Sequence, residues 1–95
     1  MKLQTNNTSR SNKHRGSLDI IADILEASKG KTRKTYLMYR CNLSFRQLKN
    51  YLNLLLKRGL LKAIEDNSNN TSLFRITEKG ERFLETYKGL VGLME

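Results

Sequence analysis

The sequence predicts a mainly α-helical domain that carries one small β-hairpin, and three observations support this fold class. Residues 17–58 place apolar side chains three and four positions apart, which is typical of amphipathic helices. After Gly59 the pattern changes to two short alternating segments on either side of the turn-forming run at 66–71, which indicates a hairpin. Helical spacing returns after Thr77 and continues to the end of the 95-residue chain, a length that suits one small domain.

The helix predicted at residues 45–58 is the best defined of the chain. Ser44 is expected to cap its N-terminus in a capping box with Gln47, and Gly59 stands where a helix ends in a left-handed residue. The side chains predicted to be buried lie in one arc: Phe45, Leu48, Tyr51, Leu52, Leu55 and Leu56. The opposite stripe contains neither an acidic nor an apolar residue and consists of Arg46, Asn50, Asn53 and Lys57.

Two interpretations of this polar stripe are open. Most amphipathic helices have one simply because that face is hydrated. The stripe also suits the DNA major groove, since Arg pairs with guanine and Asn with adenine in bidentate geometry, while Lys neutralises phosphate. Charge placement favours DNA, because the net charge is +9 and ten basic residues but no acidic ones lie between Glu26 and Glu65. A membrane would attract the same charge, but the helix uses its apolar face for a core, so no membrane role is expected.

Residues 1–16 are polar and basic with almost no apolar side chains, so they are predicted to be a disordered tail before a single domain at 17–95. Arg10, Lys13 and Arg15 could form a basic arm that follows a phosphate backbone or enters a minor groove. A tail that only improves solubility is an equally good interpretation. No signal-peptide pattern or long apolar run is present, so a cytoplasmic, nucleoid-associated protein is expected.

The order of the predicted elements defines the fold more closely. Ser17 is predicted to cap the first helix, in which Leu18 begins the apolar face and the acidic face points away from DNA. Thr32 is predicted to begin a second helix that ends near Cys41, followed by a tight turn through Asn42. Two helices joined by so short a turn, the second one basic, are typical of a helix-turn-helix, and the hairpin that follows is then a wing. The sequence therefore predicts a winged helix-turn-helix that closes with a C-terminal helix.

The predicted contacts with double-stranded DNA fall into two groups. Contacts to base edges are assigned to Arg46, Gln47, Asn50 and Asn53. Contacts to phosphate are assigned to Lys31, Arg33, Lys34, Thr35, Arg40, Lys49, Lys57, Lys62 and Arg75. The sequence has no paired carboxylates on one face, no glycine-rich phosphate loop and no Cys/His cluster, so no catalytic residue, metal site or cofactor is expected.

Two runs resemble a known family. The run KTYLMYRCNLS at 34–44 and the run FRITEKG at 74–80 are similar to segments of the small archaeal winged-helix DNA-binding proteins, which are chromatin-associated proteins or predicted transcription regulators. This resemblance implies a winged-helix fold, binding to duplex DNA through the recognition helix, and often a homodimer.

The C-terminal helix departs from the members of that family that dimerise through a long antiparallel coiled coil. It offers about two heptads, fewer than the three to four that a sustained coiled coil needs, and Gly89 and Gly92 interrupt them. A dimer through a shorter helix contact is still possible, because the apolar end of the helix at residues 90–94 would otherwise be exposed. The residues assigned to this contact are Phe83, Tyr87, Leu90, Val91 and Met94.

The sequence thus favours a double-stranded DNA-binding protein that acts as a transcription regulator or a nucleoid-associated protein. The alternative is a winged helix that serves as a protein–protein interaction module in a transcription or replication assembly, which would need a strongly acidic partner. RNA binding is less favoured, because it usually uses exposed aromatic platforms, whereas Tyr36, Tyr39, Tyr51 and Tyr87 are interpreted as edges of the core.

Overall fold

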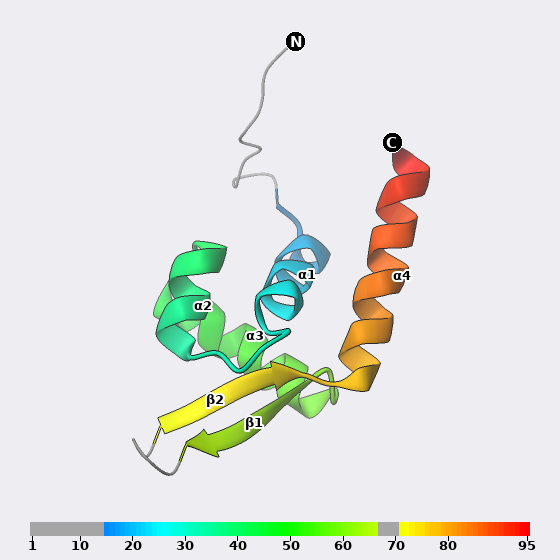
Figure 1. The fold of residues 1–95 in the computed structure, drawn as a ribbon. Coiled ribbons are helices and arrows are strands. Elements are labelled where there is room, and N and C mark those ends of the chain that lie inside the picture. The colour runs from blue at the N-terminus through cyan, green and yellow to red at the C-terminus, as the bar shows by residue number, and fades with distance from the viewer. Residues whose placement is uncertain (1–14, 67–70) are drawn as a thin grey trace.

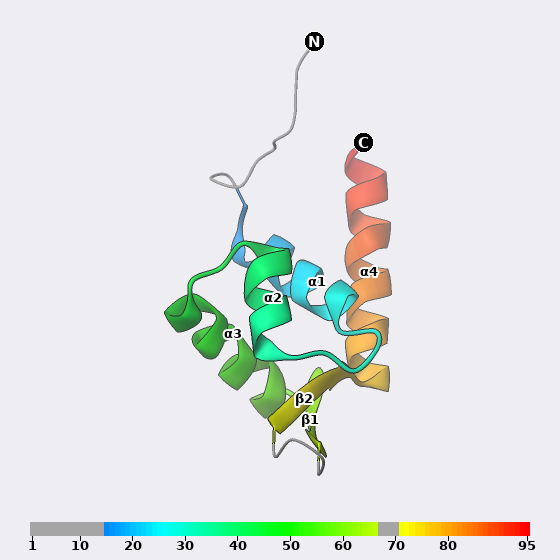
Figure 2. The ribbon, with the colours of Figure 1, turned by 60° about the vertical axis from the view of Figure 1, so that its left-hand side comes forward.

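The structure, a computed structural model, describes residues 15–66 and 71–95. The described elements follow one another as α1 (Ser17–Ala27), α2 (Lys34–Cys41), α3 (Phe45–Lys57), β1 (Leu61–Asp66), β2 (Thr71–Ile76) and α4 (Glu78–Met94). α1 lies between α2 and α4 in both views, and the hairpin extends from below the helices (Figures 1 and 2). This arrangement confirms the winged helix-turn-helix fold.

The end of α2 and both ends of α3 form as the sequence predicts. Ser44 Oγ accepts a hydrogen bond from the Gln47 backbone N–H at 3.1 Å, and Gln47 Oε1 accepts one from the Ser44 N–H at 2.9 Å. Asn42 ends α2 in the left-handed conformation (φ 56°, ψ 53°), and Gly59 follows α3 with φ +75°. Side chains and backbone within a few residues satisfy the free groups at these helix ends, so the turn needs little help from the rest of the chain.

The chain between α1 and α2 differs from the prediction. Thr32 does not begin α2 but pairs with Phe74 of β2, donating its N–H to Phe74 O at 2.9 Å and accepting from Phe74 N at 2.7 Å. Ile76 N also donates to Ser28 O at 2.8 Å. The segment therefore runs along the free edge of β2, where these hydrogen bonds outweigh its local helical preference. At the start of α1, Gly16 rather than Ser17 is the N-cap residue, and its N–H donates to Asp19 Oδ2 at 3.0 Å.

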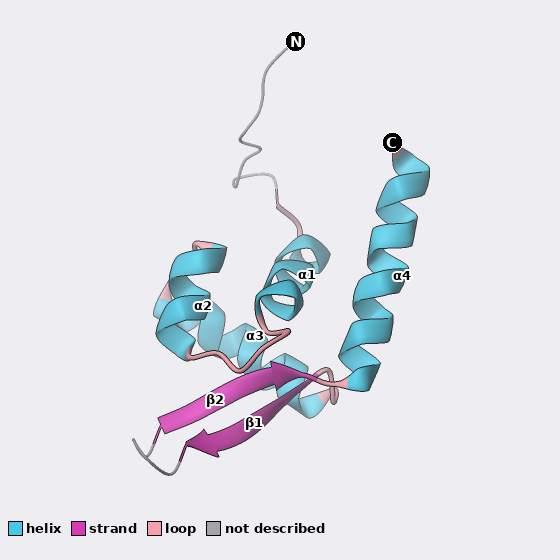
Figure 3. Cartoon of the chain, in the orientation of Figure 1, coloured by secondary structure: helices cyan, strands magenta, loops and turns pink. Residues whose placement is uncertain are grey.

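The wing is a two-stranded antiparallel sheet of β1 and β2, drawn in magenta in Figure 3. Leu61 pairs with Ile76 and Ala63 pairs with Phe74. Leu61, Phe74 and Ile76 are buried beneath the helices, so the base of the hairpin belongs to the core. This burial fixes the register, because a slip of one residue would turn these side chains to solvent.

The core is built from every helix and both strands. Its fully buried side chains include Ile24, Leu25, Leu37, Leu48 and Leu55. Two residues that the periodicity assigns to the core are instead exposed: Leu18 is 57% exposed and Phe45 is 55% exposed. Both lie in the first turn of their helices, before the first buried residue of each.

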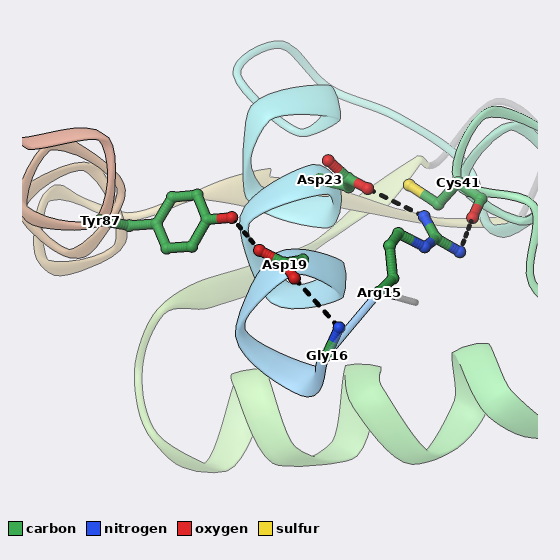
Figure 4. Close-up of polar contacts among 6 residues, drawn as sticks. All are labelled: Arg15, Gly16, Asp19, Asp23, Cys41 and Tyr87. Atoms are coloured by element: carbon green, nitrogen blue, oxygen red, sulfur yellow. Dashed lines mark hydrogen bonds and ion pairs between the residues drawn. The ribbon is translucent and has the colours of Figure 1, made fainter. Parts of the chain in front are cut away.

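α4 is held against α1 by both polar and apolar contacts. Leu84 is buried, and the Tyr87 hydroxyl forms a hydrogen bond with Asp19 of α1 (Figure 4). Lys88 Nζ lies 2.8 Å from Glu26 Oε1, and this contact is the main reason that the pKa of the Glu26 carboxyl lies below its usual value. The acidic side chains of α1 therefore bind α4 and residues 15 and 16, which precede α1.

Candidate nucleic-acid interface

The polar stripe of α3 is exposed along its whole length. The core-facing side chains Leu48, Leu52 and Leu55 are buried, and the opposite face presents an exposed set: Arg46, Asn50, Asn53 and Lys57. Within the described residues, none of these four side chains makes a hydrogen bond or an ion pair. Their donors and acceptors are thus free to bind a partner outside the chain.

Gln47 is the exception among the residues predicted to contact base edges. Its side-chain oxygen accepts from the Ser44 N–H and so completes the capping box. Only its amide nitrogen remains for a contact outside the chain. Gln47 therefore mainly stabilises the first turn of α3.

Four of the residues predicted to contact phosphate lie at or just before the start of α2. Lys31, Arg33, Lys34 and Thr35 are all exposed, and Lys31, Arg33 and Thr35 line a shallow hollow together with Tyr36 and Leu73. No side chain caps the N-terminus of α2, and its first turn contains no acidic residue. The N–H groups of that turn and the nearby cations are both suited to an anion such as a phosphate.

The exposed face of α2 also carries tyrosines that were expected at the edge of the core. Tyr39 is 89% exposed and Tyr36 is 47% exposed, whereas Tyr51 and Tyr87 pack against the core as predicted. Arg40 Nη1 donates a hydrogen bond to the Tyr36 hydroxyl at 3.0 Å, and this bond is the first cause of the raised pKa of the guanidinium. Arg40 therefore keeps the positive charge that a phosphate contact needs.

The remaining predicted phosphate-binding residues lie on α3 and on the wing. Lys49 is exposed beside the polar stripe of α3. Lys62 and Arg75 are directly opposite each other on β1 and β2, and both are exposed. Like charges in such a pair destabilise a hairpin, so an anion bound between them would remove an unfavourable interaction. The wing tip at residues 67–70 lies outside the described residues.

The basic charges of this face are not neutralised within the described chain. Of the ten basic residues between Glu26 and Glu65, only Lys29 forms an ion pair with another described residue, Glu26, at 3.3 Å. The other ion pairs of the described residues join Arg15 to Asp23 and Lys88 to Glu26, away from α3. Exposed basic side chains without an ion pair in the described chain are therefore present on α2, on α3 and at the base of the wing.

Arg15 has a different role from the one predicted for it. Its side chain is only 18% exposed, and Nη1 lies 2.8 Å from Asp23 Oδ2 of α1. Nη2 donates to the backbone oxygen of Cys41, at the end of α2, also at 2.8 Å (Figure 4). Arg15 thus joins α1 to α2 inside the domain and is not part of a basic arm; Arg10 and Lys13 lie outside the described residues.

The small Cys41 side chain lies at the end of α2, where Arg15 joins α2 to α1. Its thiol is buried, and burial raises its pKa to about 11. A protonated, buried thiol is a poor nucleophile and a poor metal ligand, which agrees with a packing role. Among the described residues, no group of three or more His, Cys, Asp or Glu side chains could hold a metal ion. None of the described helices combines the length and apolar character needed to cross a bilayer.

The chain is similar in sequence to one archaeal protein and in fold to several solved structures. An uncharacterized protein of Methanocaldococcus jannaschii is 31% identical over 93 residues, which cover 96% of this chain and 87% of that protein. Among solved structures, Sso10a-2, a DNA-binding protein from Sulfolobus solfataricus, matches with a TM-score of 0.76 and 26% identity over 84% of this chain and 82% of its own.

Two bacterial structures share the fold at lower identity. FabT from Streptococcus pneumoniae, solved in complex with DNA, matches with a TM-score of 0.64 and 15% identity over 81% of this chain and 53% of its own. A variant of ZitR from Lactococcus lactis matches with a TM-score of 0.60 and 19% identity over 84% of this chain and 66% of its own. The family model for the winged helix-turn-helix matches residues 14–95, and the chain belongs to that family.

Proposed function

We propose that this protein binds double-stranded DNA with α3 in the major groove, as a transcription regulator or a nucleoid-associated protein. The observation that carries the proposal is the exposed stripe of Arg46, Asn50, Asn53 and Lys57, which has no partner within the described chain. Arg46, Asn50 and Asn53 would contact base edges, because their side chains match the donor and acceptor patterns of guanine and adenine. The similarity to Sso10a-2, itself a DNA-binding protein, supports this function.

The surrounding cations would fix the protein on the phosphate backbone. Lys31, Arg33, Lys34 and Thr35 would hold one strand at the start of α2, where the uncapped N–H groups add to their charge. Arg40, Lys49 and Lys57 would extend these contacts along α2 and α3, and Lys62 and Arg75 would add a contact from the wing. Such contacts would provide affinity and orientation, while Arg46, Asn50 and Asn53 would provide sequence preference.

The experiment that tests this function is a titration of random-sequence duplex DNA at increasing salt. Neutralising about six phosphates should lower the affinity by roughly 10³ between about 50 and 200 mM salt, because the bound cations displace counterions from DNA. The same titration with a duplex from upstream of the protein's own gene would reveal a sequence preference. Absence of binding to any duplex at low salt would contradict the proposal and favour the protein-interaction alternative.

We further propose that the protein is a homodimer through the end of α4. Leu90, Leu93 and Met94 are 58%, 85% and 86% exposed, and Leu18 of α1 is also exposed. Phe83 and Tyr87, which the sequence places in the same contact, pack against the core of their own chain instead. The proposed contact would therefore be narrower than the sequence predicts and would centre on Leu90, Val91, Leu93 and Met94.

Replacing Leu90 with Lys should convert the dimer to a monomer, because the charge would be buried in an apolar contact. Sedimentation over a range of protein concentrations would measure the change. Tyr39→Lys provides the control, since it places the same charge at another exposed residue, which lies on α2, away from α4. A wild-type protein that stays monomeric throughout the range would contradict the dimer.

A further inference from the structure

Phe45 is an exposed apolar side chain at the start of the helix that carries the polar stripe. It is the first residue of α3 and is 55% exposed, although the periodicity of the helix places it towards the core. An isolated exposed apolar side chain is ordinary on a protein surface. Phe45 differs because the N-terminal residues of a recognition helix are those that meet base edges.

A second side chain is already placed against the Phe45 ring. The ammonium group of Lys34, the first residue of α2, lies 5.7 Å from the ring centroid, which is the geometry of a cation–π contact. The contact joins the starts of the two helices across the turn. The capping box of Ser44 and Gln47 fixes the backbone of the turn that begins at Phe45, and the Lys34 ammonium group lies over the ring.

We propose that Phe45 reads the 5-methyl group of thymine in the major groove while Lys34 binds a phosphate beside it. The methyl group is the apolar feature that distinguishes an A·T pair in that groove, and a phenyl ring is a suitable contact for it. Arg46 and Asn50 can read only hydrogen-bonding groups, so Phe45 adds a kind of discrimination that the polar stripe does not have. The inference rests on the proposed binding of duplex DNA and deepens it.

The test compares thymine with uracil, which lacks only the methyl group. Duplexes that bind best are first selected from a random library with the wild-type protein, and each thymine is then replaced singly by uracil. At one thymine the replacement should weaken binding about fourfold, the factor that corresponds to ~0.8 kcal/mol for one buried methyl-sized group. The same replacement should have no effect on binding by Phe45→Ala.

Tyr39→Ala is the matched control, because it removes another exposed aromatic ring from the same helix-turn-helix, and it should keep the full uracil effect. Wild-type binding that is insensitive to uracil at every position would overturn the inference while leaving DNA binding intact. Persistence of the effect in Phe45→Ala would also overturn it. Failure of the wild-type protein to bind any duplex would instead overturn the proposed function, and this inference with it.

The role of Lys34 has its own readout. Lys34→Gln should weaken binding to all duplexes alike and reduce the slope of log affinity against log salt by about one, because one phosphate contact is lost. Lys34→Arg keeps the charge and should keep the slope. An unchanged slope in Lys34→Gln would overturn the phosphate contact assigned to this residue.

Discussion

Gly80→Ala should destabilise the domain by about 3 kcal/mol, at the upper end of the usual cost of forcing extra atoms into a packed site. A Cβ atom at this position would lie 2.2 Å from the backbone oxygen of Leu60 and 2.7 Å from Cγ1 of Ile76. Neither neighbour can move easily, because Leu60 O accepts a hydrogen bond from Thr77 N and Ile76 is buried. α4 would have to move away from the base of the wing. Chemical denaturation followed by circular dichroism would measure the loss.

Gly89→Ala is the control within the same helix. Its Cβ would meet nothing within 4 Å, so the substitution should stabilise α4 by up to about 1 kcal/mol through helix propensity. The two substitutions are chemically identical and differ only in their surroundings. If both stabilised the domain, the close approach of α4 to the wing would be wrong.

The double substitution Arg46→Ala and Asn50→Ala should remove most of the sequence preference of DNA binding. Each bidentate contact to a base is worth ~1–3 kcal/mol, so the preference for a selected duplex over a scrambled one should fall by at least about 30-fold. Titration of both duplexes at one salt concentration would measure this ratio. The fold should be unaffected, because both side chains are exposed and make no hydrogen bond or ion pair within the described chain.

The matched control replaces Lys49 and Lys57 with Gln on the same helix. This variant should bind the selected and scrambled duplexes more weakly by the same factor, and the salt slope should fall by about two. The comparison separates reading of bases from attraction to phosphate. If the Arg46/Asn50 variant also lost affinity equally for both duplexes, Arg46 and Asn50 would not contact bases specifically.

The parts of the fold that the sequence predicts are those determined by neighbouring residues. Ser44 and Gln47 cap each other, while Asn42 and Gly59 take left-handed backbone conformations. These signals act over a few residues, so no knowledge of the tertiary structure is needed to interpret them. The exposure of the polar stripe on α3 follows in the same way from helical periodicity.

The features that the sequence does not predict depend on residues far apart in the chain. Thr32 carries no local sign that it will pair with Phe74, and Arg15 looks like any other basic residue of a polar terminus. Gly80 looks like a weak point in a helix, and only the nearness of Leu60 shows that a side chain would not fit there. The exposure of Phe45 also depends on distant residues. Helical periodicity predicts the direction in which its side chain points, but not whether other elements pack against it at the start of α3.

The separation of charge across the molecule has a consequence for the speed of binding. None of the nine acidic residues lies between Glu26 and Glu65. The carboxylates of α1 form ion pairs with Arg15 and with Lys88 of α4. α1 itself lies between α4 and the basic α2 (Figure 2). A protein with its positive charge on one side experiences a torque in the field of a polyanion and turns that side forward before contact. A larger fraction of encounters with DNA then begins in a productive orientation. The association rate constant should therefore exceed that of a protein with the same net charge spread evenly over its surface.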